Sequence, residues 1–187
     1  DLGTGCGIVA LAWYRTEETQ PRQSYGVDIQ PQAIDQLTIT VQENGLEGQV
    51  VPVLADLTDL SALPEGQSFD VVTCNPPYKI EGRGILSETD SDQIARHETA
   101  CTIDDVCRAA AWLLKFGGRF CVCQRPERLP DVMEAMRRNG LEPKRLRMVQ
   151  QRPDTAPWLF LLEGRRGGRP GLEIPAPLVL CGDDGAP

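Results

Sequence analysis

The sequence predicts an α/β protein in which a largely parallel sheet carries helices on both faces. Segments typical of strands alternate along the chain with segments typical of helices. The strand-like segments are short apolar runs without polar alternation, which is the pattern of parallel strands covered by helices. A length of 187 residues suits one domain with its own core. We therefore expect a single domain over residues 1–187.

The first half of the chain opens on a glycine-rich turn that leads into a helix. This helix is predicted over residues 7–19, where apolar side chains recur with helical spacing. A second helix begins with Pro31 in its first turn, a position that proline tolerates, and ends at Asn44-Gly45. A short strand is predicted over residues 24–28, and apolar runs of strand length predict two more over residues 50–54 and 69–74.

The second half continues the alternation and ends in an irregular segment. Thr102 begins a Thr-x-x-Asp motif typical of a helix start, and this helix is predicted to run to Leu114. Another helix is expected over residues 129–139, and strands over residues 119–124, 145–149 and 158–163. The last two strands are close in sequence, so we expect an antiparallel hairpin. Residues 164–187 are rich in Pro and Gly and predict an irregular C-terminal segment, strand-like only at 178–180.

Composition argues against a metal centre and a membrane anchor. The seven cysteines lack metal-ligand or disulfide spacing, and His97 is the only histidine. This pattern is typical of reduced, buried thiols in a cytoplasmic protein. The sequence contains no run of 18 apolar residues and does not open on a signal peptide. We expect a cytoplasmic monomer with no metal and no membrane partner.

Charge is distributed unevenly along the chain. Residues 1–70 carry 2 basic and 11 acidic residues, a net charge of −9, whereas residues 115–169 carry 13 and 6, a net charge of +7. A basic third of this kind is suited to phosphate contact, although a solvated surface explains it equally well. The candidate basic stripe consists of Arg137, Arg138, Lys144, Arg145, Arg147 and Arg152.

The glycine turn has the features of a ligand-binding loop. In Asp1-Leu2-Gly3-Thr4-Gly5-Cys6-Gly7, alternate glycines allow a sharp turn, close approach of a ligand and free amides at a helix start. The G-x-G-x-x-G pattern of dinucleotide sites fails at Ile8. The turn therefore suits a nucleoside-bearing ligand without a pyrophosphate, or a purely structural role.

Two aspartates follow neighbouring strands and strengthen the ligand interpretation. Asp28 ends the strand after the turn, where a carboxylate accepts hydrogen bonds from two ribose hydroxyls. Asp56 follows the next strand, where a carboxylate accepts from an adenine amino group. The alternative for each is a helix cap or a turn residue. We expect the turn and both carboxylates to share one crevice at the carboxyl ends of the strands.

Asn75-Pro76-Pro77-Tyr78 follows the strand predicted over residues 69–74. Two prolines end the strand and stiffen the turn. The Asn75 side-chain oxygen and the Pro76 carbonyl become fixed acceptors for an amino group whose lone pair is delocalised, and they redirect that lone pair toward an electrophile. Tyr78 offers a flat face for a planar substrate. The alternative is a plain strand-ending turn.

These motifs resemble those of class I S-adenosylmethionine-dependent amino-methyltransferases. The resemblance rests on the glycine turn, Gly26-Val27-Asp28, Ala55-Asp56-Leu57 and the Asn-Pro-Pro-Tyr motif. The segments over residues 95–98, 113–120, 125–129, 140–146, 167–172 and 177–180 are further similar to the bacterial tRNA(Val) adenine N6-methyltransferase family. This similarity covers nearly the whole chain.

The resemblance implies a Rossmann-like domain with a seven-stranded sheet and S-adenosyl-L-methionine as cofactor. It implies transfer to the N6 amino group of the tRNA adenine just 3′ of the anticodon. The implied catalytic residues are Asn75, Pro76, Pro77 and Tyr78, and the implied cofactor-binding residues are Asp1, Gly3, Gly5, Gly7, Asp28, Ile29, Asp56, Leu57 and Asn75. The alternatives are a glutamine N5-methyltransferase acting on a release factor and a non-catalytic module that binds cofactor or RNA.

Residues 79–101 form a long predicted loop, and loops of this length are often functional. We expect it to recognise substrate through Lys79, Arg83, Arg96 and His97, with His97 anchoring the loop rather than acting as a base. The family has a segment and a first strand ahead of the glycine turn. We therefore expect this chain to be truncated at its N-terminus.

Overall fold

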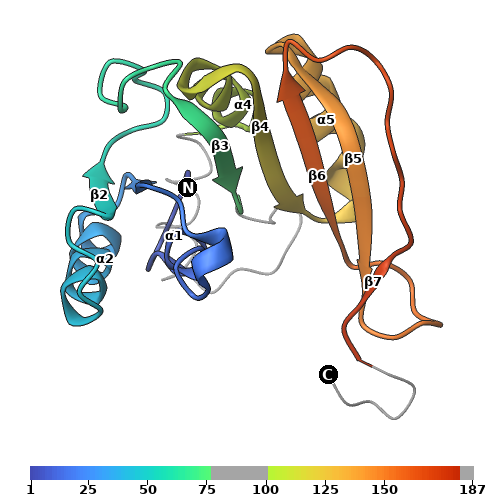
Figure 1. Ribbon diagram of the computed structural model, residues 1–187. Coiled ribbons are helices and arrows are strands. Elements are labelled where there is room, and N and C mark those ends of the chain that lie inside the picture. Colours follow the sequence, from blue (N-terminus) through green and yellow to red (C-terminus); the bar gives the residue numbers. More distant parts are fainter. Residues whose placement is uncertain (77–100, 182–187) are drawn as a thin grey trace, which may run out of the picture.

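The computed structural model describes residues 1–76 and 101–181 and has an α/β fold (Figure 1). Its helices are α1 (Ile8–Ala12), α2 (Pro31–Glu43), α4 (Ile103–Leu113) and α5 (Leu129–Arg138), with short 3-10 helices η1 (Glu17–Thr19) and η2 (Pro126–Arg128). Its strands are β1 (Ser24–Asp28), β2 (Val50–Leu54), β3 (Phe69–Cys74), β4 (Leu114–Gln124), β5 (Leu141–Gln150), β6 (Leu159–Arg166) and β7 (Leu178–Val179).

The strands form a mixed sheet. β1 and β2 pair in parallel, and a second group has the order β3-β4-β6-β5-β7. β3 and β4 are parallel, whereas β6 lies between β4 and β5 and is antiparallel to both. The predicted α/β class and the antiparallel hairpin near the C-terminus are therefore confirmed.

Asp1 and Leu2 join the two groups of strands. Leu2 forms parallel bridges to Val27 in β1 and to Cys74 in β3. The Leu2 amide donates to the Thr73 carbonyl at 2.8 Å, and the Thr4 amide donates to the Val27 carbonyl at 3.0 Å. This pairing places the glycine turn directly over the carboxyl ends of β1 and β3.

Helices lie on opposite faces of the sheet. α4 and α5 cover one face of β3, β4, β6 and β5 (Figure 1), where Phe120 and Phe160 are fully buried in the main core. A smaller apolar cluster joins α1 and α2 to β2 through Ala10, Leu37, Val41 and Val50. Within residues 1–76 and 101–181, no helix lies over the β5–β6 part of the other face, which is therefore open (Figure 1).

The first helix is much shorter than predicted. α1 ends at Ala12, and the expected continuation to Thr19 is a turn followed by η1. The Thr19 hydroxyl donates to the carbonyls of Trp13 and Thr16 at 3.0 and 3.2 Å. Such side-chain bonds to the backbone compete with helical hydrogen bonds, so the helical spacing did not suffice to extend the helix.

The strands of the second half are longer than predicted. β4 begins at Leu114 rather than at 119, because a register shift against Phe69–Val71 accommodates the extra residues. β6 continues to Arg166, which pairs with Leu141, so the irregular segment begins after Arg166 and not at Gly164. After Arg166, Glu173 forms a single parallel backbone β-bridge with Arg145, and β7 pairs in parallel with β5.

Candidate active site

The glycine turn is open on the side away from the core. Gly3, Gly5 and Gly7 have φ angles of +63°, +54° and +85°, which favour glycine strongly. A Cβ atom at Gly3 or Gly5 would meet nothing within 4 Å, whereas one at Gly7 would lie 2.3 Å from Leu37 Cδ1. Gly7 therefore allows close packing of α2, and Gly3 and Gly5 leave a backbone surface free for a ligand.

Asp1 fastens the turn to β3. Its carboxylate accepts hydrogen bonds from the Thr4 hydroxyl at 2.9 Å and from the Thr73 hydroxyl at 2.8 Å. Both oxygens thus hold the loop against β3, and the predicted contact of Asp1 with the cofactor stays a prediction. The sequence analysis missed Thr4 and Thr73, because Thr73 is 72 positions away and no motif links it to Asp1.

Asp28 contacts the glycine turn directly. Its buried carboxylate accepts from the Gly5 amide at 2.9 Å and from the Gln30 amide at 3.0 Å. The bond from the Gln30 amide is the interaction expected if Asp28 is a turn residue. The bond from the Gly5 amide connects the predicted ligand-binding loop to Asp28, the residue predicted to bind ribose. Ile29, the next residue, is 41% exposed beside it.

Asp56 follows β2 and makes a turn of its own. Its Oδ1 accepts from the amide and the hydroxyl of Thr58, both at 2.8 Å. In the described part of the chain, no donor bonds to its Oδ2. Leu57 is half-buried and packs on the main core. Burial raises the pKa of Cys101 to about 11, and the carboxylates of Asp105 and Asp56 contribute to the increase.

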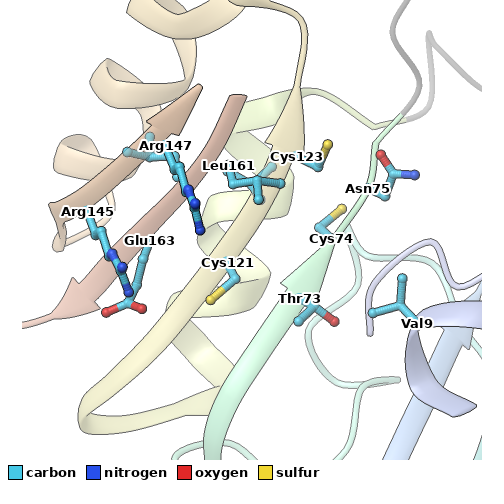
Figure 2. A pocket seen from close by; sticks show the side chains of 12 residues that line it. Val9, Thr73, Cys74, Asn75, Cys121, Cys123, Arg145, Arg147, Leu161 and Glu163 are labelled. Carbon is cyan, nitrogen blue, oxygen red and sulfur yellow. The ribbon is translucent and has the colours of Figure 1, made fainter. Parts of the chain in front are cut away.

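Asn75 lies at the carboxyl end of β3 and lines a cavity of about 380 Å³ on the open face of the sheet (Figure 2). Val9 of α1 borders it on one side, and Arg145 and Arg147 of β5 border it on the other. The remaining lining residues are Thr73, Cys74, Cys121, Val122, Cys123, Leu161, Leu162 and Glu163. Asn75 itself is exposed, and Pro76 is half-buried behind it.

The part of the cavity near Asn75 is apolar and uncharged. Burial raises the pKa of Cys74 strongly. Burial and the Glu163 carboxylate raise the pKa of Cys121 to about 11, so both thiols are protonated at neutral pH. Arg145 and Arg147 lie at its far side together with Glu163, which is opposite Arg145 in the β5–β6 pair. This side of the cavity therefore carries two positive charges and one negative charge.

The predicted basic stripe is divided by the fold. Arg137 pairs with Glu142 at 2.9 Å, and Arg138 pairs with Glu134 at 2.6 Å and with Asp104 at 3.2 Å. Arg145 and Arg147 alone among the stripe residues line the cavity. Both helix arginines thus pair with carboxylates, and of these partners only Asp104 comes from another helix and could not be read from the local sequence.

Several predicted site residues lie outside the described residues, namely Pro77, Tyr78, Lys79, Arg83, Arg96 and His97. Their roles stay predictions. Among the residues that are described, no group of three or more His, Cys, Asp or Glu side chains is arranged to hold a metal ion. The same residues include no helix long and apolar enough to cross a bilayer.

Known proteins resemble the chain in sequence and in fold. A tRNA1(Val) (adenine(37)-N6)-methyltransferase of Phocaeicola vulgatus is 26% identical over 162 residues, which is 87% of this chain and 66% of that protein. A release factor glutamine methyltransferase of Koribacter versatilis is 34% identical over 98 residues, 51% of this chain and 30% of that protein. The chain therefore spans less than two thirds of either relative.

A solved structure shares the fold. A predicted O-methyltransferase of Agrobacterium tumefaciens superposes with a TM-score of 0.75 and 18% sequence identity, covering 98% of this chain and 80% of its own. The Rossmann-like fold expected from the resemblance is thereby confirmed. The sequence profile of the family described as "Methyltransferase domain" matches residues 1–156. The chain belongs to this methyltransferase family.

Proposed function

We propose that the chain transfers a methyl group from S-adenosyl-L-methionine to the exocyclic N6 amino group of an adenine in tRNA, the adenine just 3′ of the anticodon. One observation carries the proposal. Asn75 lines a cavity at the carboxyl end of β3, next to the glycine turn. Arg145 and Arg147 line the same cavity. A neutral acceptor for an amino group and cations for phosphate therefore share one site.

The cofactor is S-adenosyl-L-methionine, which supplies an electrophilic methyl group. Gly3 and Gly5 leave open backbone at the turn, as close approach of a ligand requires. Each oxygen of the buried Asp28 carboxylate has a remaining lone pair for a ribose hydroxyl. Asp56 Oδ2 suits the adenine amino group of the cofactor. These contacts use side chains that the fold already holds in place.

Asn75 and Pro76 act on the amino group of the substrate. The Asn75 side-chain oxygen and the Pro76 carbonyl accept its two hydrogens, which favours a tetrahedral nitrogen with its lone pair directed at the methyl group. Two successive prolines in the sequence restrict the backbone next to both acceptors, so little reorganisation is expected when substrate binds. A strong base is unnecessary before attack because the proton leaves afterwards. Rate enhancement then comes mainly from positioning and exclusion of water.

A tRNA substrate is favoured over a protein substrate by the basic side of the cavity and by the similarity to tRNA(Val) enzymes over 87% of the chain. The glutamine methyltransferase relative supports a second candidate, since an amide nitrogen suits the same two acceptors. An anticodon loop offers a base that is unstacked at low cost. Peptide backbone, by contrast, provides no phosphates for Arg145 and Arg147.

A competition assay tests the substrate. The protein is incubated with methyl-labelled cofactor, bulk tRNA and a release factor together. Label should enter tRNA and, after nuclease digestion, be recovered as N6-methyladenosine. Incorporation into the release factor instead would overturn the tRNA assignment and favour the glutamine candidate.

Binding of tRNA should depend on salt. Phosphate contacts release counterions, so the affinity is expected to fall at least about tenfold between about 50 and 200 mM salt. The affinity for S-adenosylhomocysteine, measured in parallel by calorimetry, should change little. A tRNA affinity that does not vary with salt would remove phosphate contact from the proposal.

Cofactor occupancy should protect Cys6 from alkylation. Cys6 is exposed within the glycine turn, whereas Cys181 lies near the C-terminus, far along the chain from the turn. Saturating S-adenosylhomocysteine should slow maleimide labelling of Cys6 at least about fivefold, as followed by peptide mass spectrometry. Labelling of Cys181 serves as the internal control and should keep its rate. Equal rates at Cys6 with and without the compound would argue against binding at this turn.

A further inference from the structure

Trp158 and Arg125 form a stacked pair at the same sheet edge as Asn75. The Arg125 guanidinium carbon lies 5.4 Å from the centroid of the Trp158 ring, and its Nη1 donates to the Trp158 carbonyl at 3.2 Å. Trp158 is 39% exposed. A flat cation on a flat ring, both partly open to solvent, is a surface on which a nucleobase stacks.

The register of the sheet places this pair near the site. Cys74 is opposite Val122 in the β3–β4 pair, and Gln124 is opposite Phe160 in the β4–β6 pair. Arg125 and Trp158 therefore lie just past the ends of these strands, on the edge where Asn75 follows β3. β4 alone separates β3 from β6, which gives a lateral offset of two strand spacings, roughly 10 Å. Asn75 aligns with Leu161 through Cys123, and Trp158 lies three residues before Leu161 in the chain, so the offset along the strands adds roughly 10 Å. Together the two offsets place Trp158 roughly 14 Å from Asn75, a distance that a single strand of RNA spans with one or two nucleotides.

The backbone holds the pair in place without a ligand. The Trp158 amide donates to the Val149 carbonyl at 3.0 Å. The Arg125 amide donates to the side chain of Gln124 at 2.9 Å, and Gln124 is buried. A surface that is already ordered loses little conformational entropy when it binds. Arg147 of β5, the strand on the other side of β6, lines the same cavity as Asn75 and adds positive charge to this face of the sheet.

We propose that Trp158, stacked on Arg125, binds the base of a nucleotide one or two positions from the methylated adenine. This inference rests on the proposed function and names part of its substrate site. An RNA strand suits both features together, because its bases stack on the indole and its phosphates meet Arg147 and Arg125. The pair then contributes to selection of a single-stranded loop over a duplex.

Kinetics on matched tryptophan variants test the proposal. Trp158→Ala should raise the KM for tRNA about 5- to 100-fold, while the KM for the cofactor stays unchanged. Trp158→Phe keeps an aromatic face and should restore most of the loss. Trp112→Ala is the control, because Trp112 is 42% exposed but lies at the C-terminal end of α4, at the opposite edge of the sheet. An equal KM for tRNA in the Trp158→Ala and Trp112→Ala variants would overturn the proposal that Trp158 stacks on a base.

Fluorescence provides a readout independent of activity. The chain has three tryptophans, so Trp13→Phe with Trp112→Phe leaves Trp158 as the reporter. An RNA hairpin with an adenine-containing loop should quench it, whereas the same hairpin with an abasic loop should not. Absence of quenching by the intact hairpin would refute the proposal that Trp158 stacks on a base. If label enters release factor while the hairpin still quenches, the tRNA methylation proposal fails and RNA binding by this pair stands.

Discussion

Replacing Asn75 with alanine is expected to lower the rate of methyl transfer by about 10²–10³-fold or more. The side chain lines the cavity at the end of β3 and carries one of the two acceptors proposed for the substrate amino group. Loss of one fixed polar group that acts mainly in the transition state has an effect of this size in other enzymes. The measurement is a single-turnover rate with labelled cofactor, which separates chemistry from binding.

The same variant should bind S-adenosylhomocysteine with nearly normal affinity, because the glycine turn and Asp28 remain intact. Asn75→Asp is the informative companion, since it keeps an oxygen acceptor at the same place and should lose less activity than Asn75→Ala. Turnover retained in Asn75→Ala would refute the catalytic role. Loss of cofactor binding and of folding in that variant would instead indicate a structural turn.

Gly5→Ala should weaken cofactor binding at least about tenfold. Gly5 has φ +54°, its amide donates to Asp28, and a Cβ there would project into the open space that we assign to the cofactor. An alanine in this conformation also costs about 1–2 kcal/mol of backbone strain. The dissociation constant for S-adenosylhomocysteine is measured by calorimetry, and the free energy of unfolding by urea titration.

Gly45→Ala is the matched control for this experiment. Gly45 has φ +62°, a Cβ there would also meet nothing within 4 Å, and it follows α2 away from the turn. Both variants should lose similar stability, and Gly5→Ala alone should lose cofactor affinity. Equal affinities in the two variants would show that the glycine turn does not contact the cofactor.

Short apolar strands were predictable because their limits are local. The bounds of β1, β2 and β3 agree with the predicted strands, since each is a brief segment flanked by turn residues. The capping box at Thr102 is also present, with the Asp105 amide donating to the Thr102 hydroxyl at 3.2 Å. A capping box spans only four positions, so a sequence motif captures it fully.

Long strands were less predictable because their partners are distant in sequence. β4 extends back to Leu114 through pairing with Phe69, and β6 extends forward to Arg166 through pairing with Leu141. Local composition at Gly117-Gly118 and Gly164 favoured turns at both places. Hydrogen bonding to neighbouring strands prevailed over that local preference.

From the sequence by itself, the glycine turn, Asp28 and Asp56 predicted a site for a nucleoside-bearing ligand, and Asn75 predicted an acceptor for an amino group. The resemblance of these motifs to a known family added the prediction of methyl transfer. The tertiary structure decided which of them hold the site together and what surrounds it. Asp1 meets Thr73 across 72 positions, and Arg125 meets Trp158 across 33. Contacts of this kind depend on strand order and register. Those are set by packing of the whole sheet, so no local pattern in the chain records them.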